Sequence, residues 1–147
     1  VDSAQGLADL REDRPETEFA AAHLDPRPHV CEGAWLGKQR AVHAMMDLSD
    51  GLASDLGHIL KASGAGAEIS VECIPTRTTV GLAVTGGEDY RLLLTADPDE
   101  ADALIERYAR QFGTPLYEIG RIVEGGDIRW KENGRAIRPC WQGFRHF

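Results

Sequence analysis

The feature that most constrains the fold is a short apolar segment that ends in carboxylates and leads directly into an amphipathic segment. Residues 44–48 read Ala-Met-Met-Asp-Leu, and Ser49, Asp50 and Gly51 follow them. Apolar side chains then recur at the spacing of one helix face, at Leu52, Leu56, Ile59 and Leu60. The pattern predicts a strand, a turn and a helix that stops at Ser63-Gly64.

The rest of the chain predicts further helices and strands in mixed order. We expect helices over residues 4–12, 16–24 and 97–112, with a weaker one over 29–42. We expect strands over residues 67–71, 90–95, 116–123 and 128–131, the second of them covered on both faces. Residues 134–147 show no periodicity. This order predicts an α+β fold of mixed α/β layers, in which helices cover a mixed sheet.

Length and charge exclude several classes of protein. A chain of 147 residues is long enough for one domain with a real core, and it has no run of about 18 apolar residues that could span a membrane. Its 24 acidic and 16 basic residues give a net charge of −8, which argues against nucleic acid as a partner. An anionic small substrate would need a divalent cation to bridge it to carboxylates.

The three cysteines, Cys31, Cys73 and Cys140, fit neither a disulfide framework nor a zinc site, because they are odd in number and widely spaced. We expect reduced thiols in a cytoplasmic protein, with Cys73 and Cys140 buried. The chain opens at Val1 without an initiator methionine or a signal segment, and we interpret it as a piece of a longer protein.

Asp47, Ser49 and Asp50 form the first candidate site, because the predicted strand delivers two carboxylates and a hydroxyl to the start of a helix. Carboxylates favour Mg²⁺, and N–H groups at a helix start favour phosphate oxygens, so the phosphates of a magnesium-bound nucleotide are a sensible ligand. Alternatively, Ser49 or Asp50 is the N-cap of the helix, a role worth about 1 kcal/mol. The two interpretations are compatible.

The second candidate site is the segment 86–90, where Gly86 and Gly87 allow a tight backbone and Glu88 and Asp89 precede a strand. A carboxylate at a strand entrance can accept a hydrogen bond from a ligand nitrogen. The alternative is a solvated turn in which Asp89 bonds to its own backbone.

Two other features carry alternatives. The tail holds Trp141, Phe144 and Phe147, which could stack on a planar heterocycle or could pin the chain end to the core. Asp55 and His58 lie three residues apart on the predicted helix, and we interpret them as a solvent-facing pair rather than as metal ligands.

Taken together, these motifs resemble a known family. Residues 46–63, 86–90, Gly120-Arg121 and 143–147 resemble, in the same order, the C-terminal half of the bacterial thiamine-monophosphate kinase family. The resemblance implies that residues 1–147 are the C-terminal domain of a two-domain kinase in the superfamily of aminoimidazole ribonucleotide synthetase and selenophosphate synthetase. It also implies an N-terminal metal- and ATP-binding domain outside this chain, through which the full-length protein forms a homodimer.

The activity implied by the resemblance is transfer of the γ-phosphoryl group of ATP to thiamine monophosphate, giving thiamine diphosphate and ADP. Asp47 and Asp50 would bind Mg²⁺, and Ser49 would contact ATP. Glu88 and Phe144 would contact thiamine monophosphate, and no covalent nucleophile is required. Two alternatives stay open: a sister ATP-dependent enzyme with another acceptor, and a non-catalytic module that binds thiamine phosphates.

The chain also departs from the family pattern. Phe144 stands where relatives often have Tyr, Arg91 stands where they usually have Glu, and the segment between Pro75 and Gly86 is shorter. These changes would reshape the thiamine end of the site. Because the N-terminal domain lies outside these residues, we expect the isolated chain to be catalytically silent.

Overall fold

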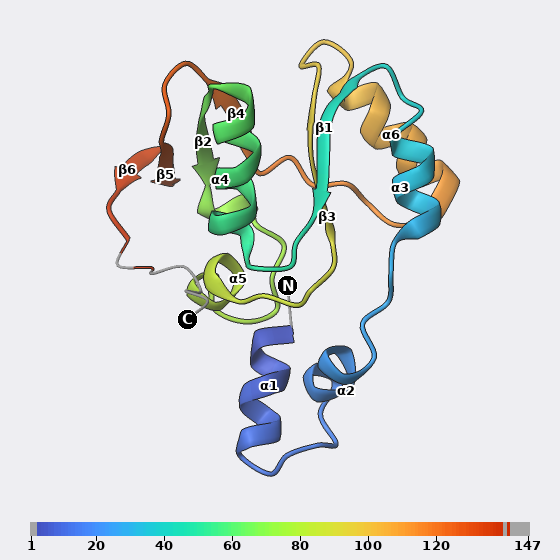
Figure 1. Cartoon of the computed structure of the whole chain (residues 1–147), viewed down its shortest axis with the longest axis vertical. Helices are drawn as coiled ribbons and strands as arrows, with labels where there is room; N and C mark the ends of the chain where they lie inside the picture. Colours follow the sequence, from blue (N-terminus) through green and yellow to red (C-terminus); the bar gives the residue numbers. More distant parts are fainter. Residues whose placement is uncertain (1–2, 140, 142–147) are drawn as a thin grey trace.

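The computed structural model describes residues 3–139 and 141, and Figure 1 shows the arrangement of their helices and strands. The α-helices are α1 (Ser3–Arg11), α2 (Glu18–Leu24), α3 (Val30–Leu36), α4 (Leu52–Ser63), α5 (Val80–Thr85) and α6 (Ala101–Phe112), and η1 (Val71–Cys73) is a 3-10 helix. The strands are β1 (Val42–Asp47), β2 (Gly66–Ser70), β3 (Leu92–Ala96), β4 (Gly120–Val123), β5 (Ile128–Glu132) and β6 (Arg135–Ile137). None of the helices in this part of the chain has the length and apolar character needed to span a membrane.

The strands form two sheets. β1 and β3 pair antiparallel, and the other four strands form a mixed sheet in the order β4-β2-β5-β6. Within that sheet β2 runs antiparallel to β4 and parallel to β5. Helix α4 connects β1 to β2 and therefore joins the two sheets (Figure 1). The α+β architecture with mixed layers is as predicted.

Two apolar clusters hold the layers together. The first packs the buried face of α4 against β2 and α5, and all four residues predicted for that face, Leu52, Leu56, Ile59 and Leu60, belong to it. The second joins α3 to α6, where Trp35, Tyr108 and Phe112 stack edge to face or tilted. In β3, Leu93 belongs to the first cluster, and Leu92 and Leu94 pack on the second. Strand β3 is thus covered on both faces, as predicted.

Helices α1 and α2 form a hairpin whose turn is built around a buried carboxylate. Asp9 is only 1% exposed. It accepts hydrogen bonds from the Thr17 hydroxyl at 2.7 Å and the Gln5 amide at 2.8 Å, and it pairs with the Arg14 guanidinium at 2.6 Å. The Thr17 hydrogen bond, the Gln5 hydrogen bond and the Arg14 charge hold the pKa of Asp9 below its ordinary value.

Several predicted boundaries were wrong. The helix expected over 29–42 stops at Leu36, because Gly37 ends it, and β1 begins at Val42. Helix α5 was missed, since six residues are too few to establish a period. Strand β6 was missed although Asn133-Gly134, both at positive φ, form the two-residue turn typical of a hairpin.

Cysteine burial was also predicted wrongly in part. Cys73 is exposed at the end of η1, as is Cys31 in α3, and neither forms a disulfide. Cys140 lies outside the described residues. The exposure of Cys73 follows from its place in a short connection, where no layer covers it.

We predict that replacing Asp9 with asparagine destabilises the chain above the ordinary carboxyl pKa of 3.8. A carboxyl group whose pKa is lowered by folding stabilises the folded state only while it is ionised. The difference in the free energy of unfolding between wild type and Asp9→Asn should therefore be largest above this pH. It should shrink as the pH falls through the lowered pKa of the folded state. Urea unfolding of both chains between pH 7 and pH 3 measures it. A difference independent of pH would contradict the assignment.

Candidate functional site

The two acidic segments predicted as separate sites lie against each other. The Leu48 N–H donates to the Arg91 carbonyl at 2.7 Å, and the Tyr90 N–H donates to the Leu48 carbonyl at 2.9 Å. The Glu88 N–H donates to the Ser49 carbonyl at 2.8 Å. These bonds continue the pairing of β1 and β3 beyond the strands, so residues 47–50 and 88–91 form one site.

Glycines permit this close approach. A Cβ at Gly87 would collide with the Ser49 carbonyl oxygen, and one at Gly86 would collide with Ala4 and with the carbonyl of Leu82. Gly51 has φ +98°, and a Cβ there would meet three backbone atoms of residues 84–86 at 3.0 Å. Of the two glycines predicted to allow a tight backbone, Gly87 therefore packs one acidic segment on the other, whereas Gly86 makes room for Ala4 of α1 and for the end of α5.

Asp55 holds the backbone of the first acidic segment through hydrogen bonds. Its side chain is fully buried, and one carboxylate oxygen, Oδ2, accepts the N–H groups of Ser49 at 3.0 Å and Asp50 at 3.1 Å. The other oxygen, Oδ1, is buried without a hydrogen-bond partner in the described part of the chain. Burial raises the pKa of Asp55, although the two N–H groups act in the opposite direction.

This geometry corrects two predictions. The N-cap of α4 is Gly51, which has no side chain to cap with, so neither Ser49 nor Asp50 is the N-cap. Asp55 is buried and does not face solvent, whereas its neighbour His58 is exposed, as expected. An aspartate in the first turn of a predicted helix, four residues after a glycine, was the signal that could have revealed this role.

One group of side chains in the described residues could hold a cation. Ligand atoms of Asp50, Asp55 and His58 lie within 4.8 Å of one another. The carboxylate oxygens of Asp50 and Asp55 suit Mg²⁺, and the buried Oδ1 of Asp55 accepts no hydrogen bond from the described residues. Asp47, at the exposed end of β1, lies outside this trio. Of the two predicted Mg²⁺ ligands, Asp50 therefore belongs to this trio and Asp47 does not.

Glu88 projects from a strained backbone. Glu88 and Tyr90 have φ of 64° and 49°, values that side chains other than glycine rarely adopt. The Glu88 carboxylate is 59% exposed and lies 3.5 Å from His23 Nδ1, which also lies 2.7 Å from the Ser3 hydroxyl. The Ser3 N–H donates to Asp89 at 3.0 Å, so Asp89 is tied to α1 and the turn is more than a solvated loop.

The aromatic tail is described only at Trp141. Its ring meets that of Trp130 edge to face at 5.1 Å between centroids, and it packs on the first apolar cluster. Trp141 thus pins this part of the chain to the core, which is one of the two predicted roles. Phe144 and Phe147 lie outside the described residues, so the substrate contact predicted for Phe144 stays a prediction.

We predict that Asp55→Ala destabilises the chain by about 2 to 4 kcal/mol, because two part-buried N–H groups lose their acceptor and a buried side chain is removed. Asp55→Asn keeps an acceptor oxygen at almost the same volume and should cost clearly less. Equilibrium urea unfolding measures both variants. Equal losses would indicate that side-chain volume, and not the shared hydrogen bonds, is what matters at this position.

Comparisons with known proteins agree with this fold. The family described as AIR synthase related protein, C-terminal domain, matches residues 6–131. The thiamine-monophosphate kinase of Salmonella typhimurium strain LT2 is 34% identical over an alignment of 165 residues, gaps included. The alignment covers 99% of this chain and 49% of that protein. The chain thus spans about half the length of the curated relatives that it matches most fully.

Solved structures show the same similarity. The crystal structure of thiamine-monophosphate kinase from Stenotrophomonas maltophilia K279a has a TM-score of 0.77 and 30% identity, over 93% of this chain and 48% of that one. AaThiL complexed with AMPPCP and TMP has a TM-score of 0.72 and 28% identity, over 97% of this chain and 48% of that one. Because the family match covers most of the described residues, the chain belongs to the AIR synthase related protein family and represents its C-terminal domain.

Proposed function

We propose that this chain is the C-terminal half of a kinase that transfers the γ-phosphoryl group of ATP to thiamine monophosphate, giving thiamine diphosphate and ADP. The observation that carries the proposal is the joining of segments 47–50 and 88–91 into one acidic site, in a chain whose relatives are named thiamine-monophosphate kinases. A similar structure was solved with AMPPCP and TMP bound, which supports ATP as the phosphoryl donor. The chain covers about half of the relatives' length, and we propose that the full-length protein also contains an N-terminal domain and forms a homodimer.

Asp47 and Asp50 are the proposed Mg²⁺ ligands, with Ser49 contacting ATP. When bound, Mg²⁺ would neutralise phosphate charge that otherwise repels this acidic chain. The N–H groups of Ser49 and Asp50 both donate to Asp55. A ligand at this segment therefore meets the Ser49 hydroxyl and the carboxylates rather than these two backbone donors. By holding the backbone of Ser49 and Asp50, Asp55 thereby orients the side chains of these two residues.

Glu88 and Phe144 are the proposed contacts to the acceptor. The Glu88 carboxylate is largely exposed beside the Ser49 segment, and the backbone bond between Glu88 and Ser49 sets the spacing of the two. A carboxylate in this place can accept a hydrogen bond from an amino or ring N–H group of the acceptor. Phosphoryl transfer itself requires alignment and charge stabilisation and needs no covalent nucleophile from this chain.

We predict that Asp50→Asn lowers the Mg²⁺-dependent formation of thiamine diphosphate by the full-length protein by about 100-fold or more, since an amide is a weaker Mg²⁺ ligand than a carboxylate. Glu106→Gln, an exposed substitution on α6 with the same loss of charge, should leave the rate unchanged. Product formation is measured by chromatography, with thermal unfolding alongside.

Three results would redirect the proposal. A large loss of thermal stability in Asp50→Asn would assign Asp50 a structural role instead. A folded wild-type protein that binds ATP but uses another phosphorylated or carboxylated acceptor would be a sister enzyme of the same superfamily. Binding of thiamine phosphates without ATP turnover would indicate a non-catalytic module.

We further predict that the 147-residue chain alone forms no thiamine diphosphate, because it spans only about half of the relatives' length. The same assay measures this, with the full-length protein as the positive control. Steady turnover by the isolated chain would show that the other half is dispensable for the chemistry.

A further inference from the structure

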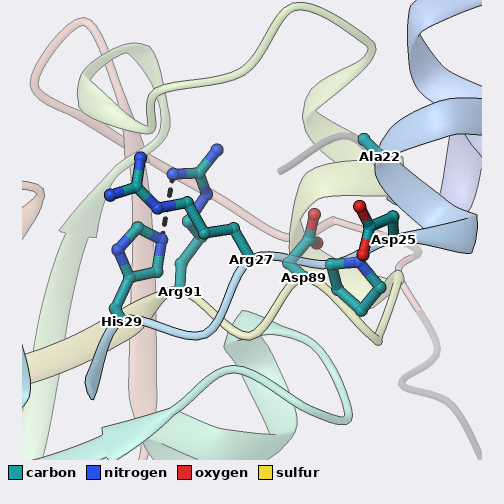
Figure 2. Close-up of a pocket in the computed structure, with 7 residues that line it drawn as sticks. Ala22, Asp25, Arg27, His29, Asp89 and Arg91 are labelled. Atoms are coloured by element: carbon teal, nitrogen blue, oxygen red, sulfur yellow. Dashed lines mark hydrogen bonds between the residues drawn. The ribbon is translucent and has the colours of Figure 1, made fainter.

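A polar cavity lies beside Asp89 and Arg91, which follow Glu88 in the chain. It has a volume of about 130 Å³ and is formed between the connection from α2 to α3 and the residues that precede β3. Its charged and titratable lining comes from Asp25, Arg27, His29, Asp89 and Arg91, as Figure 2 shows. None of the roles proposed above uses this cavity.

The charges of this cavity are segregated. In Figure 2 the side chains of Arg27, His29 and Arg91 gather at one end, and the carboxylates of Asp25 and Asp89 lie at the other. The chain as a whole carries 24 acidic and 16 basic residues, so a basic end of this kind runs against the average charge of the molecule. Basic groups that converge on one space repel each other unless an anion is placed among them.

His29 holds Arg91 in position. An Arg91 guanidinium nitrogen, Nη1, lies 3.2 Å from His29 Nε2, and a guanidinium can only donate, so Nε2 is the acceptor. The ring proton is then on Nδ1, which lies 3.3 Å from the Glu32 carboxylate and donates to it. The charge of Glu32, which is 8% exposed, is directed at the imidazole. Arg91 keeps its full charge and its remaining donors.

Among the described residues, neither arginine has a carboxylate at salt-bridge distance, although the charge of Arg27 acts on the Glu32 carboxyl group and helps to lower its pKa. Within residues 3–139 and 141, neither Arg27 nor Arg91 forms a salt bridge, whereas the side chains of Arg14, Arg77, Arg129 and Lys131 do. Arginine guanidinium groups match phosphate oxygens well, because they present parallel N–H donors in a planar fork. The acidic end at Asp25 and Asp89 would repel a second negative group, so a compact anion fits better than an extended polyphosphate.

We propose that the basic end of this cavity is a binding site for a single phosphate group, with Arg27 and Arg91 as the donors and His29 as the residue that positions Arg91. The group is either inorganic phosphate or the phosphoryl group of a larger metabolite. This inference goes beyond the proposed kinase function and does not require it, because the site lacks the proposed Mg²⁺ and ATP contacts.

The test is isothermal titration of the full-length protein with inorganic phosphate, in EDTA and without nucleotide so that Mg²⁺-dependent binding is suppressed. Arg27→Ala and Arg91→Ala should each weaken phosphate binding about tenfold or more, the loss expected for charge-assisted hydrogen bonds. Arg91→Glu should abolish binding. Arg91→Lys should fall between, because it keeps the charge but loses the fork. Arg110→Ala, an exposed change at the end of α6, is the matched control and should bind as wild type.

A second titration with thiamine monophosphate under the same conditions separates the two sources of phosphate. If the variants bind both thiamine monophosphate and inorganic phosphate more weakly, the cavity receives the phosphoryl group of the metabolite. If only the affinity for inorganic phosphate falls, the cavity receives the free ion. The proposal is overturned if wild type binds no phosphate at millimolar concentration, or if the arginine variants bind as wild type does. Variants that lose thermal stability but keep phosphate affinity would also overturn it, since the arginines would then serve contacts within the protein. A kinase assay that fails leaves these titrations unaffected.

Discussion

The shared acceptor at Asp55 is the contact on which the rest of the site depends. One buried carboxylate oxygen takes the N–H groups of both Ser49 and Asp50, so the chain turns sharply between β1 and α4 without a conventional N-cap. With this turn held, the Ser49 carbonyl accepts the Glu88 N–H. Folding an ionisable group into the core costs free energy, which the two hydrogen bonds offset in part.

The same constraint explains why glycine is needed in two distant places. Gly87 lies against the Ser49 carbonyl, and Gly51 lies against the backbone of residues 84–86, so each segment leaves room for the other. The strained backbone of Glu88 and Tyr90 is tolerated because hydrogen bonds to residues 48 and 49 hold both residues. The proposed phosphate-transfer site is thus built mainly from backbone contacts.

Charge is distributed unevenly around this junction. The proposed Mg²⁺ ligands Asp47 and Asp50 lie at the start of the segment that leads to α4, where a polyphosphate could approach only with cations. Arg91 follows the Glu88 segment directly and faces the cavity it shares with Arg27. One short stretch, residues 88–91, therefore borders both an acidic and a basic site, and a small change of residue there would alter the preference of either.

The sequence alone determined the order of the elements other than α5 and β6, the apolar face of α4 and the two acidic motifs, because these depend on local spacing and on residue type. It did not reveal that Asp55 is buried, since an acidic residue in a first helical turn is equally compatible with solvent. Nor could it show that segments forty residues apart meet, or that Arg27 and Arg91 share one cavity. Those features depend on how β1 and β3 pair and on where the α2–α3 connection passes. Long-range packing, which no local pattern encodes, decided them.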